Sequence, residues 1–315
     1  MFLMITYFSM MIILLIFLFI MILISVAFLT LMERKFLSYI QIRKGPNKLG
    51  ILGMFQPFSD AVKLMSKEFY LMMKLNYLIY FFSPIIGLML ILLMWLIYPT
   101  LYNYLSFNLS FLYLMCCLSF SVYSLLMAGW SSNSSYSMLG SIRTLAQSIS
   151  YEVSLIIIML VPLFLIDNLN LSYFFIIQKN FWLIFFSYPL GLIFFFSIMA
   201  ELNRTPFDFS EGESELVSGF NVEYMSSGFT LIFLSEYASI LFLSFLFSLI
   251  FLGSNFVSFM FYLKIMLMSF LVIWIRGTMP RFRYDLLMYL CWLLILPFSL
   301  NYMFYMIFFK LMIFK

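Results

Sequence analysis

Six of the chain's 13 acidic residues lie in or just after one polar segment. They are Glu201, Asp208, Glu211, Glu213, Glu215 and Glu223. If residues 211–215 are extended, their three carboxylates share one face at a spacing of about 7 Å. Like charges so close raise one another's pKa, so we expect part of the cluster to exchange protons near neutral pH as a coupled set. A solvated acidic loop is the simpler alternative.

Two further carboxylates, Glu152 and Glu236, fall near the middle of long apolar runs. An ionised carboxylate inside a membrane costs at least about 2.5–3.5 kcal/mol, so such residues usually line proton or ion paths or pair internally. Arg143 is a poor partner for Glu152, because nine residues place it about half a turn away around a helix. The pattern favours a proton relay, with a buried structural ion pair as the alternative.

Other kinds of chemistry lack their usual residues. The chain has no histidine, which removes the commonest general base and metal ligand. The adjacent Cys116 and Cys117 and the single Cys291 do not have the spacing of a zinc or iron–sulfur site. A glycine-rich phosphate loop is also missing. We therefore expect this chain to bind no cofactor and no metal itself.

The elements that position these carboxylates are expected to be membrane helices. Of 315 residues, 65% are apolar and 10% charged, whereas soluble domains have roughly 45–50% and 25%. A bilayer core of about 30 Å needs roughly 20 apolar residues per helix. Runs of that length predict spans at 8–31, 77–98, 107–129, 142–166, 181–201, 224–252, 256–275 and 287–309. We expect an all-α polytopic membrane bundle of about eight transmembrane helices, forming one integral membrane domain over residues 1–315.

The basic residues predict an orientation for this bundle. Thirteen of the 17 fall in or near loops on one side: Arg34, Lys35, Arg43, Lys44, Lys48, Lys63, Lys67, Lys74, Arg143, Arg204, Arg276, Arg281 and Arg283. The other four are Lys179, Lys264, Lys310 and Lys315. Because positive loops stay on the inner side of a membrane, we expect both termini on the opposite, positive-poor side.

The first loop holds a second constellation of polar residues. Glu33-Arg34-Lys35 ends the first span, and Gln56-Pro57-Phe58-Ser59-Asp60 opens a short amphipathic helix that we expect to lie in the membrane interface. A basic face that contacts anionic lipid would explain the lysines and arginines of this loop. It would not explain Glu33 beside Arg34, or Asp60.

Together these motifs resemble one family, the mitochondrially encoded chain 1 subunits of respiratory NADH:ubiquinone oxidoreductase (complex I). The resemblance covers most of the chain. Its specific parts are Glu33-Arg34-Lys35, the turn at residues 41–50, Gln56-Pro57-Phe58, the loop at residues 201–219, and Pro280-Arg281-Phe282-Arg283-Tyr284-Asp285.

The resemblance implies a core membrane subunit of a proton-translocating NADH:ubiquinone reductase, with no activity expected from the isolated chain. A quinone tunnel would be lined on its membrane side by Arg34, Arg43, Phe58 and Asp60. An acidic relay that couples quinone reduction to proton pumping would comprise Glu33, Glu152, Glu201, Glu211, Glu213, Glu215 and Glu236. Glu223 is not carried over from the family, and its role stays open.

The resemblance also implies cofactors, partners and location. Ubiquinone would be the substrate, while NADH, FMN and iron–sulfur clusters would bind partner subunits. The partners would be hydrophilic subunits at the quinone site, antiporter-like membrane subunits and membrane lipids, without nucleic acid. The location would be the mitochondrial inner membrane, with positive loops facing the matrix and both termini facing the intermembrane space. A bacterial inner membrane is the minor alternative.

Two other classes of membrane protein also bury carboxylates. A secondary transporter should have corresponding interrupted helices in its two halves, and no such correspondence is evident. A membrane anchor in a hydrogenase-type complex would share the acidic loop without needing a quinone tunnel, and its co-purifying partners would distinguish it. The loop at residues 276–285 is open to two interpretations, functional or topogenic.

Overall fold

The computed structural model describes residues 2–70, 73–99, 107–179, 181–210, 212, 219–253 and 255–313. Helices and their connections make up this part of the chain, which contains no strand. Seven of its helical segments are long and apolar enough to cross a membrane. The expected all-α polytopic membrane bundle is confirmed.

The long helices are α1 (Phe2–Ile40), α3 (Tyr77–Met94), α4 (Ser110–Ser131), α5 (Ser135–Ile166), α10 (Ser226–Phe251) and α11 (Phe259–Thr278). The last span joins α12 (Tyr284–Tyr289), the π-helical η5 (Leu290–Ile295) and α13 (Leu296–Ile313). Shorter elements are η1 (Ile51–Gly53), α2 (Gln56–Ser66), η2 (Trp95–Ile97), η3 (Leu171–Tyr173), α6 (Phe174–Ile177), α7 (Leu183–Phe186), α8 (Tyr188–Glu201) and η4 (Gly219–Asn221). The helix expected after Pro57 is therefore α2.

The expected fifth span, 181–201, is divided into α7 and α8. Ser187 leaves the helical region, with φ −124° and ψ 47°, and its hydroxyl donates to the Leu183 carbonyl at 2.9 Å. Pro189 follows in the first turn of α8, where its missing N–H costs nothing. The prediction of one continuous helix is wrong here, although 19 residues at a rise of about 1.5 Å each still cover about 28 Å.

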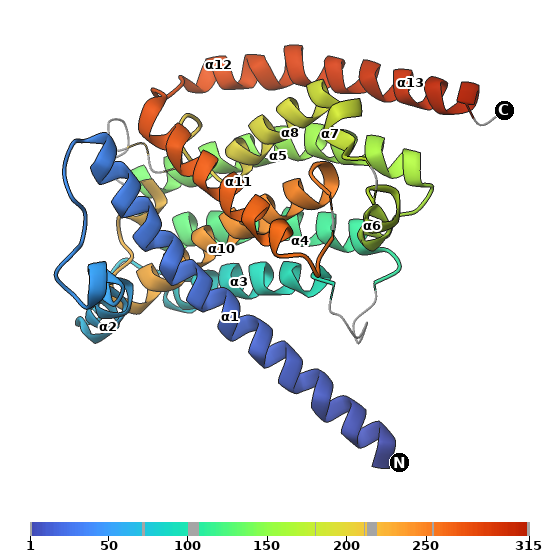
Figure 1. The fold of residues 1–315 in the computed structure, drawn as a ribbon. Coiled ribbons are helices and arrows are strands. Elements are labelled where there is room, and N and C mark those ends of the chain that lie inside the picture. Colours follow the sequence, from blue (N-terminus) through green and yellow to red (C-terminus); the bar gives the residue numbers. More distant parts are fainter. Residues whose placement is uncertain are drawn as a thin grey trace.

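The helices run side by side, so the bundle has two ends (Figure 1). We call the end at the left of Figure 1, which contains the loop between α1 and α3, the basic end. There the main-chain N–H of Asn76, before α3, donates to the Ser131 carbonyl at the end of α4. At the opposite end, the N–H of Phe111 in α4 donates to the Leu169 carbonyl after α5. The start of α1 and the end of α13 both point to that opposite end.

The core lies around α10, in which residues 240–251 are all buried. α4 packs between α3 and α5, and α10 packs along α3. α1 lies at the periphery, because only 17% of its most apolar 18-residue stretch is buried inside the protein. An apolar run faces lipid or protein equally well, so this division between core and periphery depends on how the helices pack.

Candidate functional site

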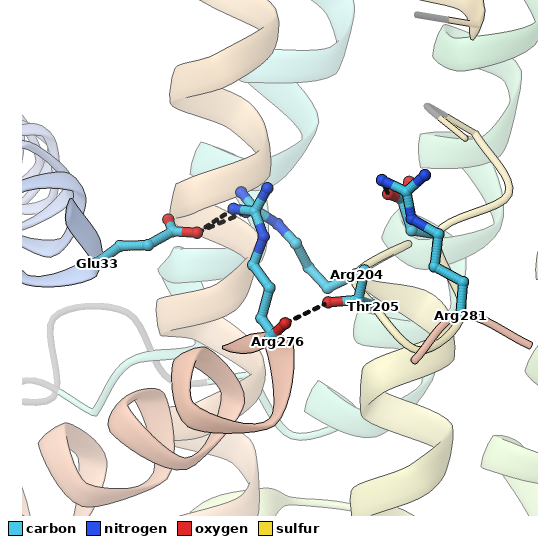
Figure 2. A network of polar contacts seen from close by, with 6 residues as sticks. Glu33, Arg204, Thr205, Arg276 and Arg281 are labelled. Carbon is cyan, nitrogen blue, oxygen red and sulfur yellow. Dashed lines mark hydrogen bonds and ion pairs between the residues drawn. The ribbon is translucent and has the colours of Figure 1, made fainter. Parts of the chain in front are cut away.

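A buried carboxylate joins three elements at the basic end. Glu33 of α1 is 3% exposed, and its Oε1 accepts a hydrogen bond from Nη1 of Arg204 at 3.2 Å. Arg276 of α11 donates to the same oxygen, as Figure 2 shows. A buried carboxylate is tolerated when it is paired and hydrogen-bonded in this way. Glu33 therefore ties α1 to α11 and to the segment after α8.

Arg204 continues this charge cluster inward. Its side chain is 11% exposed, and its guanidinium lies 4.6 Å from the centroid of the Tyr237 ring on α10. Burial alone would lower the pKa of Arg204, but the Glu33 carboxylate, with Tyr237 and Glu236, raises it above its ordinary value. Arg204 therefore stays cationic and connects Glu33 electrostatically to Glu236.

The segment after α8 is fastened to the loop after α11. The Thr205 hydroxyl donates to the Arg276 carbonyl at 3.4 Å, and the Phe282 N–H donates to the Pro206 carbonyl at 3.0 Å (Figure 2 shows the first). Arg281 forms an ion pair with the buried Asp208 at 3.3 Å. The start of the 276–285 loop thus holds the beginning of the acidic segment in place, a structural role beyond membrane orientation.

Gln147 of α5 is a residue that the sequence analysis missed. It is fully buried, and its Nε2 donates to the Ala200 carbonyl at 2.7 Å and to the Phe207 carbonyl at 3.1 Å. One side chain therefore fixes both the end of α8 and the start of the acidic segment. A glutamine inside a predicted span was the only signal available, because the two carbonyls lie 53 and 60 residues away in the chain.

Three of the predicted relay carboxylates come together deeper in the bundle. Glu201 ends α8, and it interacts electrostatically with Glu152 of α5. Oε2 of Glu201 and Oε1 of Glu152 are buried without a hydrogen-bond partner among the described residues. Glu201 and Glu236 line the same cavity of about 80 Å³. Buried carboxylates that face a shared cavity inside a membrane bundle are suited to passing protons.

The structure places the predicted relay residues differently, and their role as a relay stays a prediction. Glu33, Glu236, Glu201 and Glu152 form a series of neighbours in this order, in which Arg204 stands between Glu33 and Glu236. Glu33 differs from the others, because it is held by two arginines. Glu211, Glu213 and Glu215 lie outside the described residues. Glu223 has a buried Oε2, and its carbonyl accepts a hydrogen bond from the Tyr80 hydroxyl at 2.7 Å.

The predicted tunnel residues are brought together in part. Arg34 of α1 and Asp60 of α2 form an ion pair, and Phe58 packs its ring edge to face on Phe28 of α1, with centroids 6.1 Å apart. Arg43 is exposed and donates to Gln41 in its own loop at 2.9 Å, so it does not join the other three. α2 therefore docks on the end of α1 through one polar and one aromatic contact.

Comparison with known proteins identifies the family of this chain. A family model described as NADH dehydrogenase matches residues 12–307. NADH-ubiquinone oxidoreductase chain 1 of Locusta migratoria is 58% identical over 292 residues, which cover 93% of each chain. The same subunit of Anopheles gambiae is 57% identical over 284 residues, 90% of each chain, and that of Branchiostoma lanceolatum is 45% identical over 278 residues, 88% of this chain and 89% of the other. The chain therefore belongs to the NADH dehydrogenase family, among its chain 1 members.

Proposed function

We propose that this chain is a core membrane subunit of mitochondrial NADH:ubiquinone oxidoreductase, in which it lines the quinone tunnel and couples quinone reduction to proton pumping. The names of its relatives support its assignment to this enzyme. The coupling role is supported by one observation, the buried series of charges from Glu33 through Arg204 to Glu236. This series links the surface where α2 docks to the carboxylates inside the bundle.

The proposed mechanism is electrostatic. Quinone reduction creates a negative charge beside the Arg34–Asp60 pair, and a negative charge raises the proton affinity of carboxylates near it. At about 10 Å and an effective dielectric constant of about 20, one charge is worth about 1.7 kcal/mol, or more than a tenfold change in proton occupancy. Glu236, Glu201 and Glu152 then take up and release protons as the quinone charge appears and is neutralised.

We place the basic end in the matrix and both termini in the intermembrane space. Support comes from the helix arrangement, which collects at one end the loops that hold most of the basic residues, while Lys179, Lys264 and Lys310 belong to the other end. Hydrophilic partner subunits, which carry FMN and the iron–sulfur clusters, would then dock on the basic end. Antiporter-like subunits and lipid would contact the apolar flanks.

The relay is tested by Glu201→Gln in the assembled enzyme. An amide cannot take up a proton near neutral pH, so we expect the rate of quinone reduction by NADH to fall about tenfold or more. Proton uptake by membrane vesicles should fall with it. Glu213→Gln and Glu215→Gln extend the test to the acidic segment. Glu68→Gln is the matched control, because Glu68 is exposed at the basic end; full activity and proton yield in Glu201→Gln would contradict the relay.

The tunnel assignment is tested by Asp60→Asn. The Arg34–Asp60 pair is half exposed on the arginine side, so its loss should cost at most about 1 kcal/mol of stability. Without Asp60, the Arg34 side chain is no longer held in one position beside the proposed tunnel. We therefore expect the KM for quinone to rise about threefold while kcat changes little. Lys63→Gln, an exposed charge change on the same helix, should leave the KM unchanged. An unaltered KM in Asp60→Asn would exclude this pair from quinone binding.

A further inference from the structure

The cavity that contains Glu201 and Glu236 has an apolar part, which includes Ile91, Met94 and Phe242, and a polar part made mainly by small side chains. It lies between α3, α4, α10 and the end of α8, with Ser121 and Ser124 on α4 and Ser235 and Ser239 on α10. Gly87 forms part of the α3 wall. Because a water molecule needs only about 10–15 Å³ of such space, about 80 Å³ accommodates several waters.

All four serine hydroxyls already use their protons. Each donates to the main-chain carbonyl three residues earlier: Ser121 to Leu118 at 2.6 Å, Ser124 to Ser121 at 2.7 Å, Ser235 to Ile232 at 2.6 Å and Ser239 to Glu236 at 2.6 Å. A hydroxyl has one donor and two acceptor lone pairs, so these oxygens are left as acceptors.

The cavity is consequently rich in acceptors. Its described lining contains two carboxylates, four serine oxygens and the Asn203 side-chain amide, but neither lysine nor arginine. Oε2 of Glu201 is buried without a protein partner among the described residues, a position that a water molecule satisfies. Such a lining binds species that donate hydrogen bonds, which are water, protonated water and a protonated carboxyl group.

Gly87 provides the space on the α3 side. A Cβ atom at this position would lie 3.3 Å from Oγ of Ser124 and 3.7 Å from its Cβ, so a methyl group fits after a small shift. A branched side chain would extend further toward Ser124. The alternative interpretation is a glycine that only lets α3 and α4 approach closely, as small residues do between membrane helices.

We propose that Gly87 and the four serines hold a water cluster that carries protons between Glu201 and Glu236. A proton enters the cluster from one carboxylic acid while the last water gives a proton to the other carboxylate, so the cluster keeps its composition. The serine oxygens orient the waters by accepting from them. This inference rests on the proposed relay, and it assigns positioning roles to residues that carry no charge.

The test compares Gly87→Val with Gly191→Val in the assembled enzyme. Valine at position 87 fills the cavity, and we expect quinone reduction to fall about tenfold, with a larger solvent deuterium isotope effect and an unchanged KM for quinone. Gly87→Ala should show a smaller loss, about twofold. Gly191 lies on α8 outside the cavity lining, and its Cβ would meet only ordinary contacts at 3.6 Å, so its variant should keep the wild-type rate.

A second variant covers the case in which Gly87→Val does not assemble. Ser121→Ala together with Ser124→Ala removes two acceptors without adding bulk, and should lower the rate about threefold with the same isotope signature. Wild-type rates in both variants, with Glu201→Gln impaired, would overturn the water cluster and leave the relay standing. Wild-type rates in Glu201→Gln and Glu236→Gln would instead contradict the proposed relay function itself.

Discussion

Glu33→Gln is expected to destabilise the assembled enzyme by about 3–5 kcal/mol, the usual cost of breaking a buried ion pair by removing one partner. The substitution leaves Arg204, only 11% exposed, without its carboxylate, and it removes the partner of Arg276 as well. Because Glu33 connects α1, α11 and the segment after α8, their packing should loosen together. The measurements are the amount of assembled enzyme and the temperature at which half of the quinone reductase activity is lost.

The control for Glu33→Gln is Asp285→Asn. The Arg283–Asp285 pair spans 3.7 Å and both side chains are 82% exposed, so its loss should leave the inactivation temperature unchanged. The double variant Glu33→Gln with Arg276→Gln should recover part of the stability, because one unpaired cation is removed with the carboxylate. A stable, fully active Glu33→Gln enzyme would show that this cluster does not hold the basic end together.

Gln147→Glu should have a comparable effect by a different mechanism. The new carboxyl group would face the Ala200 and Phe207 carbonyls in a fully buried position, where a carboxylate has no donor to replace the lost amide. Burying an unpaired charge costs several kcal/mol, so the folded protein would tolerate the new carboxyl group only in its protonated form. A rise in pH removes that proton and leaves a buried charge, so we expect the yield of assembled Gln147→Glu enzyme to fall from about pH 5 to pH 8.

Two further variants separate the effect of the buried charge from that of the lost hydrogen bonds. Gln41→Glu makes the same change on an exposed loop beside Arg43 and should not lower the yield of assembled enzyme. Gln147→Leu removes both hydrogen bonds but adds no charge, and should cost only about 1–3 kcal/mol. Equal yields of Gln147→Glu and wild type across the pH range would mean that the glutamine does not anchor the acidic segment.

The ion pairs of Glu33 are a feature that residue types and spacing alone could not predict. In the sequence it is one more acid near the end of an apolar run, and the family resemblance placed it in the acidic relay. Its two arginine partners lie 171 and 243 residues away in the chain. Such a pairing depends on which helices pack together, so the difference between Glu33 and the acids of the cavity could not be derived from composition or spacing.

The sequence by itself predicted an all-helical membrane bundle, the grouping of most basic residues in loops on one side and the presence of carboxylates inside apolar spans, but not the division of the fifth span into α7 and α8. These are local properties, because bilayer thickness and the cost of burying charge act on each run of about 20 residues separately. The tertiary structure alone decided which acids are paired and which share a cavity. It joined Glu201 to Glu152 and Glu236, attached Gln147 to two distant carbonyls and opened space beside Gly87. Those contacts arise from side-chain packing between helices that are far apart in the chain, which no hydropathy pattern specifies.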